Sequence, residues 1–255
     1  MRLQEQSWVD IGGMDKTGIV IVVPLGALEQ HGHHLPLGVD SYLIQALAEL
    51  VEKSLPDQVM LLPTVWVGHS PHHMKFPGTV SVSQNVYADL LEQIVSSLVT
   101  AGYTKFLFLN GHGGNALPVQ MALQALKNRF RDHRSLLICG LSYWNLARKE
   151  MQEIRDSALG GMGHACEMET SMMMHLYPDY VDETNRKKDG RQPPIESLAI
   201  DMLHSSPVSV VYDFDELTET GTFGDPTLAT KEKGKQFMEA IVRNLNGFIS
   251  DIAVK

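Results

Sequence analysis

The chain's architecture follows from residues 19–40, IVIVVPLGALEQHGHHLPLGVD. Residues 19–23 are apolar at odd and even positions alike, which is typical of a central strand in a parallel sheet covered on both faces. A carboxylate and three imidazoles follow directly, and Asp40 ends the stretch with a second carboxylate. Imidazole and carboxylate groups are common metal ligands in enzymes. The stretch therefore predicts a buried strand that leads into a metal site.

Strand-like and helical segments alternate along the rest of the chain. This alternation predicts βαβ units with a mostly parallel central sheet, and 255 residues suffice for one large domain, residues 1–255. In such a sheet, ligands bind beyond the carboxyl ends of the strands. The further predicted strands are residues 59–62, 106–109 and 136–141, and the predicted helices are residues 42–55, 85–101, 116–130 and 229–249.

Charge and hydropathy argue against two classes of partner. The formal net charge is -9 and no block of Lys or Arg occurs, so a nucleic-acid groove is not expected. The N-terminal residues lack the pattern of a signal peptide, and no apolar run approaches the roughly 20 residues needed to span a bilayer. We expect a cytoplasmic protein that does not bind membranes.

The histidines gather behind the predicted strands. Three of the 11 histidines follow the first strand, three follow the second and one follows the third. This clustering is expected if the carboxyl edge of the sheet carries the functional site. The histidines concerned are His31, His33, His34, His69, His72, His73 and His112.

Glu29, His31 and Asp40 form the centre of the predicted metal site. Glu29 and His31 are two residues apart, so on an extended backbone their side chains project to the same side. Asp40 lies just before a predicted helix, where a carboxylate could bridge two divalent ions about 3.5 to 4 Å apart, as in many hydrolases. Alternatively, Asp40 is only the N-cap of that helix. His112 supplies a further nitrogen.

His112 lies in the glycine-rich motif NGHGGN, residues 110–115. Glycines allow the backbone to approach a metal or substrate closely and expose N–H groups. We therefore expect Gly113 and Gly114 to contact the substrate, together with His73 behind the second strand. The alternative is that these glycines only form a tight turn between strand and helix.

A second glycine-rich motif, GGMGHACEMET at residues 160–170, contains an imidazole and two carboxylates. His164 is predicted to open a helix and to share one helical face with Glu167, whereas Glu169 points elsewhere. One of these two glutamates is expected to complete the shell of a second metal ion. His164 is suited to carry protons near neutral pH.

Four residues near these motifs allow two interpretations. Alternation along a strand places His33 on the ligand side and His34 opposite, and each could support the ligands or be a polar loop residue. Cys166 is a ligand or reactive thiol, or it is a buried packing residue. Trp144 lines the substrate pocket or packs in the core.

Several ordered motifs resemble the creatininase (creatinine amidohydrolase) family. The resemblance extends to about residue 178 and resumes at GDPTLAT, residues 224–230. It implies a three-layer α/β/α fold, a homo-oligomer that is commonly a hexamer, and two divalent metal ions. The other motifs are GALEQHGHHLPLGVD at 26–40, FPGT at 76–79, NGHGGN at 110–115, SYW at 142–144 and GHACEMET at 163–170.

The family pattern also implies a role for each matching residue. Asp40 would bridge the two ions, and His164 matches the histidine that handles protons. The resemblance places Glu29 and His112 on one ion, and His31 and Glu169 on the other.

Two positions depart from the family members that hydrolyse creatinine itself. Those enzymes carry NGHYEN, with a glutamate where this chain has Gly114, and a tryptophan lid where this chain has Gly160. Trp144 is retained. Loss of the lid is expected to enlarge the pocket and to weaken stacking on a small planar ring. Relatives with NGHGGN include a formamidopyrimidine-type deformylase and a peptidase that trims a redox-cofactor precursor.

We therefore predict a metal-dependent amidohydrolase that cleaves a C–N bond of a cyclic amide or formamide substrate with metal-activated water. Glu169 and His164 are the expected catalytic residues. Carboxylate and imidazole ligands suit Zn²⁺ best, with Mn²⁺ or Fe²⁺ as alternatives. Competing hypotheses are the deformylase or peptidase activity of the relatives, a non-catalytic metal-binding assembly protein, and a hydrolase that uses Cys166 as nucleophile.

Overall fold

Four parallel strands form the central sheet of this computed structural model, which describes residues 1–204 and 206–255. The strand order is β2-β1-β3-β4, so that the first strand along the chain lies inside the sheet. Each strand lies where the sequence predicted one, and the ends differ by only a residue or two. The strands are β1 (Val20–Leu25), β2 (Val59–Leu61), β3 (Lys105–Asn110) and β4 (Leu137–Ser142).

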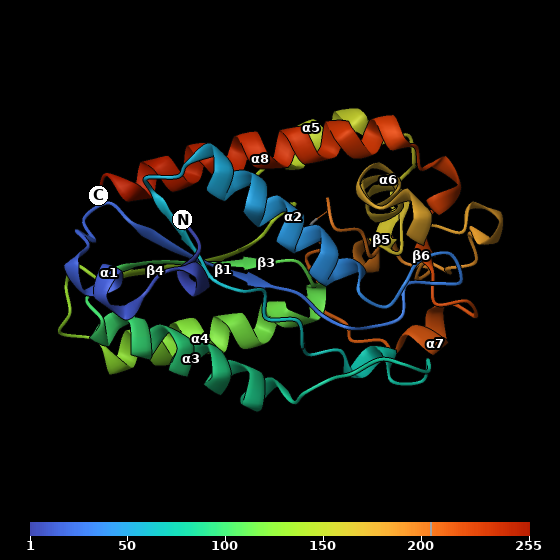
Figure 1. Cartoon of the computed structure of the whole chain (residues 1–255). Coiled ribbons are helices and arrows are strands. Elements are labelled where there is room, and N and C mark those ends of the chain that lie inside the picture. The colour runs from blue at the N-terminus through green and yellow to red at the C-terminus, as the bar shows by residue number, and fades with distance from the viewer. Residues whose placement is uncertain (205) are drawn as a thin grey trace.

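Helices cover both faces of the sheet, as Figure 1 shows. Val20 and Val22 of β1 pack toward the helices on one face, and Ile21 and Val23 pack toward the helices on the other. This alternation gives two hydrophobic cores and confirms the predicted three-layer α/β/α fold. The first face carries α2 (Val39–Ser54), α5 (Arg148–Ile154) and α8 (Lys231–Ala253), and the second carries α3 (Gln84–Thr100) and α4 (Ala116–Arg129). A short helix near the N-terminus is α1 (Trp8–Gly13).

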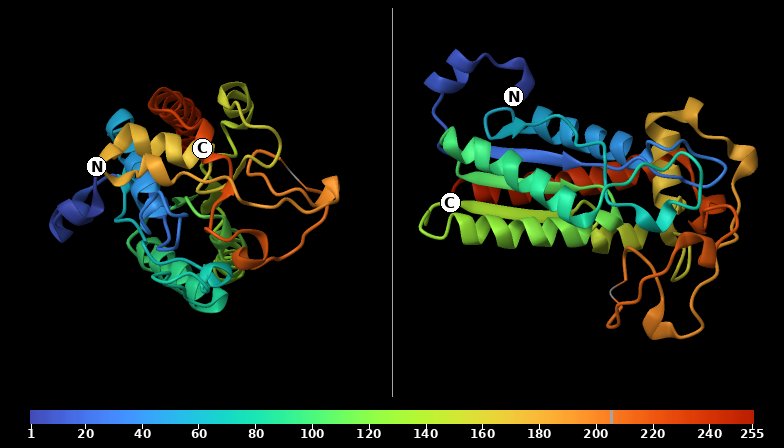
Figure 2. Two further views of the ribbon diagram at one scale, coloured as in Figure 1. Left: turned by 90° about the vertical axis from the view of Figure 1, so that its right-hand side faces the viewer. Right: turned by 90° about the horizontal axis from the view of Figure 1, so that it is seen from below.

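A smaller unit lies beyond the carboxyl ends of the parallel strands (Figures 1 and 2). It contains an antiparallel pair of short strands from distant parts of the sequence, which the sequence analysis did not predict. The unit therefore faces the edge at which we expected the functional residues. Its elements are β5 (Met162–His164), α6 (Glu167–Leu176), α7 (Phe214–Leu217) and β6 (Phe223–Gly224).

His164 lies in β5, so the prediction that it opens a helix was wrong. The backbone bends between β5 and α6 because Ala165 adopts a positive φ of 49°. The helix α6 begins only at Glu167. His164 and Glu167 therefore do not share a helical face.

A search of the described residues finds no helix that is both long and apolar enough to cross a bilayer.

Candidate metal and catalytic centre

Six ionisable side chains meet at the carboxyl edge of the sheet, where β1 and β3 end and α6 begins. All of them are almost completely buried, with exposures of 7% or less. Charged groups are rarely buried without partners or a bound ion, so this cluster is the strongest candidate for a functional site. Its members are Glu29, His31, Asp40, His112, His164 and Glu169.

His31 presents one ring nitrogen to the cluster. Its Nδ1 lies 3.1 Å from the carbonyl oxygen of Glu29 and donates a hydrogen bond to it. In the neutral ring the other nitrogen, Nε2, then carries a lone pair, and this atom lies 3.3 Å from Oδ1 of Asp40. A backbone carbonyl that orients a histidine in this way is typical of metal ligands.

Asp40 faces the cluster from the first turn of α2. The N-cap of this helix is Gly38, so the alternative that Asp40 serves as the N-cap is not what the structure shows. Its Oδ1 lies near His31, and its Oδ2 lies 3.3 Å from Nδ1 of His112. Asp40 therefore connects two ligand candidates that come from different strand ends.

His112 is held by the loop that follows β3. Its backbone N–H donates to Oδ1 of Asn110 at 3.2 Å, which fixes the start of the loop. Its Nε2 lies 3.1 Å from the carbonyl oxygen of His69 and donates to it. In the neutral ring the Nδ1 atom then carries a lone pair and faces Asp40.

The structure separates the roles of the two glutamates in α6. Glu167 accepts hydrogen bonds from the backbone N–H groups of Asp156 and Ser157, both at 2.9 Å, and from Lys233 at 2.6 Å. Glu167 is therefore satisfied within the scaffold. Glu169 is the glutamate whose carboxylate lies with His31 and Asp40.

The pKa values reflect crowding of acidic groups in a buried space. Burial raises the pKa of Glu169 to about 7, and the charge of Asp40 adds to this effect although His31 opposes it. Burial alone would lower the pKa of His31, but the charge and hydrogen bond of Asp40 and the charges of Glu169 and Glu29 together outweigh it and raise the pKa to about 9. A bound cation would compensate the negative charge of these carboxylates.

Several buried atoms of the cluster have no hydrogen-bond partner in the protein, as is expected of atoms that ligate a cation. Both carboxylate oxygens of Glu29, Nε2 of His31 and Oδ2 of Asp40 are in this state. Unpaired buried acceptors are costly, and all four atoms are potential metal ligands. The residues present therefore fit a divalent metal ion.

Two of the possible ligand sets share one residue. Glu29, Asp40 and His112 form one set, and His31, Asp40 and Glu169 form another; within each set the ligand atoms all lie within 4.8 Å of one another. Asp40 is common to both.

His164 and His73 approach the same oxygen of Glu29. His164 Nδ1 lies 3.6 Å and His73 Nε2 lies 3.3 Å from Oε1. Burial lowers the pKa of both imidazoles well below the usual range, and neighbouring histidines add to the effect. Both rings are thus neutral near pH 7, as a proton acceptor and a neutral hydrogen-bond donor require.

Phe214 of α7 is an aromatic neighbour that the sequence analysis missed. Its ring centroid lies 4.1 Å from that of His73 and 4.9 Å from that of His164. No spacing or motif around residue 214 indicates this role, because α7 reaches the site only through the fold of a long loop.

His33 and His34 lie opposite to the prediction from strand alternation. His33 is exposed, whereas His34 is buried with its Nε2 2.9 Å from the hydroxyl of Thr170. The chain turns at Gly32, whose φ of 68° breaks the alternation. That prediction was therefore wrong.

Cys166 and Trp144 are both packed into the hydrophobic core on the α2 and α8 side of the sheet. Burial raises the pKa of the Cys166 thiol well above its usual value, which disfavours a reactive thiolate. Trp144 is 7% exposed and packs edge-on against Tyr143 with ring centroids 4.9 Å apart.

Gly113 and Gly114 differ sharply in the space around them. A Cβ atom at Gly113 would meet nothing within 4 Å. A Cβ atom at Gly114 would lie 2.2 Å from the carbonyl oxygen of His69 and 2.4 Å from Nε2 of His112. The glutamate of creatinine-hydrolysing enzymes therefore cannot be placed on this backbone.

The space beside Gly160 is filled, contrary to the predicted enlargement of the pocket. Gly160 has a φ of 89°, and a Cβ atom there would lie 2.6 Å from the side-chain nitrogen of Gln192. That nitrogen donates to the carbonyl oxygen of Gly160 at 3.2 Å. Gln192 thus occupies the neighbourhood in which the family's tryptophan would begin.

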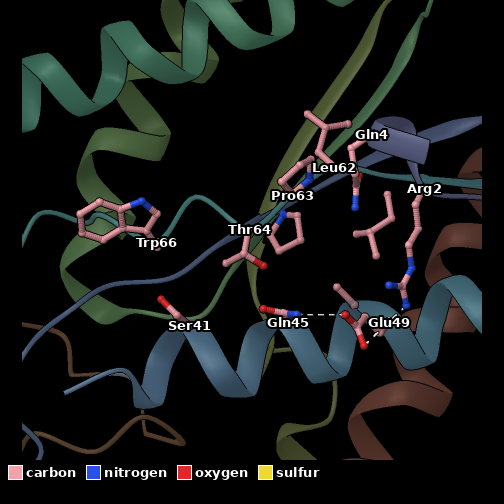
Figure 3. A pocket seen from close by; sticks show the side chains of 12 residues that line it. Arg2, Gln4, Ser41, Gln45, Glu49, Leu62, Pro63, Thr64 and Trp66 are labelled. Carbon is pink, nitrogen blue, oxygen red and sulfur yellow. Dashed lines mark hydrogen bonds and ion pairs between the residues drawn. The ribbon is translucent and has the colours of Figure 1, made fainter. Parts of the chain in front are cut away.

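A separate polar cavity of about 340 Å³ lies between the N-terminal segment, β2 and α2 (Figure 3). Its lining includes Arg2, Glu49 and the exposed Trp66. The guanidinium of Arg2 lies 3.6 Å from the carboxylate of Glu49, so these two charges compensate each other. None of the clustered ligand candidates lines this cavity, and we do not assign catalysis to it.

The sequence profile described as "Creatininase: Creatinine amidohydrolase" matches residues 4–249. The chain belongs to the creatininase family. It is thus a hydrolase of this family, as predicted, and the cluster occupies the strand edge at which we expected its site.

Three creatininase-family relatives differ in the reactions that their names describe. The mycofactocin precursor peptide peptidase of Mycobacterium tuberculosis is 31% identical over 237 residues, covering 90% of this chain and 84% of the relative. The 3-dehydro-scyllo-inosose hydrolase of Thermotoga maritima is 27% identical over 253 residues, covering 91% and 77%. The creatinine amidohydrolase of Pseudomonas putida is 28% identical over 239 residues, covering 89% and 86%.

Solved creatininases share the fold and include metal-bound forms. A mutant creatininase of Zn-Zn type matches with a TM-score of 0.83 and 25% identity, covering 98% of this chain and 97% of its own. A manganese form of creatininase also has a TM-score of 0.83, with 24% identity over 98% and 97% of the two chains. The creatininase fold predicted from the motifs is therefore confirmed.

Proposed function

We propose that this creatininase-family hydrolase cleaves a C–N bond of a cyclic amide or formamide at a centre with two divalent metal ions. The observation that carries the proposal is the position of Asp40, which is shared by two ligand sets. Glu29 and His112 would hold one ion, His31 and Glu169 would hold the other, and Asp40 would bridge them. When bound, such ions supply a Lewis acid for the carbonyl group and make water acidic at neutral pH.

Zn²⁺ suits these ligands best, with Mn²⁺ or Fe²⁺ as alternatives, because imidazole and carboxylate groups bind all three. Zinc and manganese forms of related creatininases support this choice.

We assign proton transfer to His164, whose ring is neutral and lies beside Glu29. A neutral imidazole can accept a proton from water and pass it to the leaving nitrogen. Glu169 lies with His31 and Asp40, and its raised pKa would help it share a proton before a metal binds.

The substrate would lie against the exposed Gly113, with Gly114 and His73 as further contacts. Phe214 covers His73 and His164 and would exclude water from the reacting bond. The collision at Gly114 and the filled space at Gly160 favour a substrate other than creatinine.

A second candidate is the trimming of a small peptide. It is favoured by the peptidase relative, which is 31% identical across 90% of the chain. A deformylase acting on formamidopyrimidine-type substrates remains within the same chemistry, because it also cleaves an amide-like C–N bond.

We further propose a single domain that assembles as a homohexamer in the cytoplasm. The family resemblance and the acidic composition support this proposal.

The test is turnover by metal-depleted protein before and after addition of Zn²⁺ or Mn²⁺. The substrates are creatinine, larger lactams, formamides and short peptides. We expect no activity after chelation and recovery with metal. Metal binding without any turnover would favour a non-catalytic metal-binding assembly protein. Activity that resists chelators but is lost on alkylation would favour Cys166 as the nucleophile.

A further inference from the structure

Gln30 contacts the imidazoles of His73 and His164 at the same time. Its side-chain Nε2 lies 2.8 Å from Nδ1 of His73, and its backbone carbonyl oxygen lies 2.6 Å from Nε2 of His164. Gln30 itself is 5% exposed. The residue is therefore placed to control which nitrogen of each ring carries a proton.

Two backbone groups fix the orientation of the Gln30 amide independently of the histidines. The N–H of Gly32 donates to Oε1 at 2.8 Å, and Nε2 donates to the carbonyl oxygen of Gly221 at 3.0 Å. Gly221 has a φ of 89°, and a Cβ atom there would lie 1.9 Å from Oε1 of Gln30. The glycine thus lets the backbone approach closely enough to hold the amide.

An amide nitrogen has two hydrogens and no acceptor lone pair. Because one hydrogen points to Gly221, the other must be donated to Nδ1 of His73. His73 then carries its own hydrogen on Nε2, and this atom lies 3.3 Å from Oε1 of Glu29.

The same logic applies to His164. The carbonyl oxygen of Gln30 can only accept, so Nε2 of His164 donates to it. The nitrogen that faces the metal ligands is then Nδ1, which lies 3.6 Å from the same oxygen of Glu29.

We propose that Gln30 is a positioning residue that turns Nε2 of His73, with its hydrogen, and Nδ1 of His164 toward Glu29. His73 lies in a possible third ligand set with Glu29 and His72. Binding an ion there through Nε2 would require the hydrogen to move to Nδ1, where it would meet the N–H of Gln30. Gln30 thereby keeps His73 out of metal coordination.

Neutron diffraction from crystals of the deuterated, metal-loaded protein tests the proton positions directly. We expect deuterons on Nε2 of His73 and of His164 and none on Nδ1 of His73. A deuteron on Nδ1 of His73 would overturn the inference. This result does not depend on turnover, so it is separable from failure of the proposed hydrolysis.

Crystals soaked in excess Zn²⁺ test the exclusion of metal from His73. Anomalous scattering should show no ion between Glu29, His72 and His73 in the unchanged protein. In Gln30→Met, which keeps the side-chain length but has no donor, we expect an additional ion there. The matched control is Thr79→Val, since Thr79 accepts only from the backbone N–H of Gln30 at 3.2 Å; this variant should bind no ion at that place.

An ion at this place in the unchanged protein would refute the exclusion. The exclusion would also be refuted if Gln30→Met crystals held zinc at the other ligands but no ion between Glu29, His72 and His73.

Discussion

Nε2 of His31 lies 3.3 Å from Oδ1 of Asp40, although His31 belongs to the loop after β1 and Asp40 to the first turn of α2. The loop between them turns back at Gly32, which brings both residues into the cluster. A short stretch of sequence thus supplies three of the five ligand candidates, so metal binding depends on the geometry of this loop.

Asp40→Asn should remove both ions, because Asp40 belongs to both ligand sets. Glu169→Gln should weaken only the ion on His31 and Asp40. Elemental analysis of the purified proteins measures the metal content per chain. The control is His33→Asn, which changes an exposed ring in the same loop and should keep the full content. Full metal content in Asp40→Asn would show that the bridging role is wrong.

Gly114→Ala should disrupt the centre, whereas Gly113→Ala should leave the fold and the metal content unchanged. The difference follows from the 2.2 Å contact of a Cβ atom at Gly114 with the backbone of His69 and the open space at Gly113. We expect the metal affinity of Gly114→Ala to fall at least about 10-fold, as substitution of groups that support metal ligands commonly does. Titration with Zn²⁺ measures this, and equal affinities in the two variants would contradict the argument.

Lys233→Met should destabilise the protein by about 3 kcal/mol, because it leaves the buried carboxylate of Glu167 without its cation. Lys235→Met is the matched control on the same helix. Lys235 is half-exposed and lies 4.0 Å from Glu239, so its loss should cost well under about 1 kcal/mol. Urea unfolding of the two variants measures the difference, and similar costs would argue against a structural role for Glu167.

The free energy of unfolding should fall as the pH decreases from about 6.5 to about 4, in part because of His34. Burial, together with the charge of His31, lowers the pKa of His34 to about 4, compared with about 6.5 in an unfolded chain. The unfolded state therefore takes up a proton that the folded state does not, which costs about 3 kcal/mol over this range. His34→Gln should show a shallower dependence in urea unfolding at several pH values. An identical dependence in both proteins would refute the assignment.

The parallel sheet and its helices were predictable from sequence because each element carries its own signal. Residues 19–23 and the corresponding runs are apolar in the pattern of buried strands, and the four strands appear at those places. The ligand candidates of the first segment were also predictable, since Glu29, His31 and Asp40 are close in sequence and follow a strand.

The remaining features depend on contacts between distant residues. β5 and β6 are too short and too rich in glycine to show a strand pattern, and they pair across a long stretch of sequence. The bend at Ala165 places His164 in a strand and not at the start of a helix. The turn at Gly32 breaks the strand alternation from which we predicted the sides of His33 and His34. Phe214 carries no motif at all. Such placements are set by tertiary packing, which a local pattern does not contain.

The ligand candidates come from three segments of the chain: the loop and helix after β1, the loop after β3, and α6. Ions bound among them would cross-link the C-terminal unit to the ends of the parallel strands. Their binding free energy would then add to the stability of the folded state, since an unfolded chain cannot assemble the ligands. The supply of metal would therefore determine the stability of the folded enzyme as well as its catalytic activity.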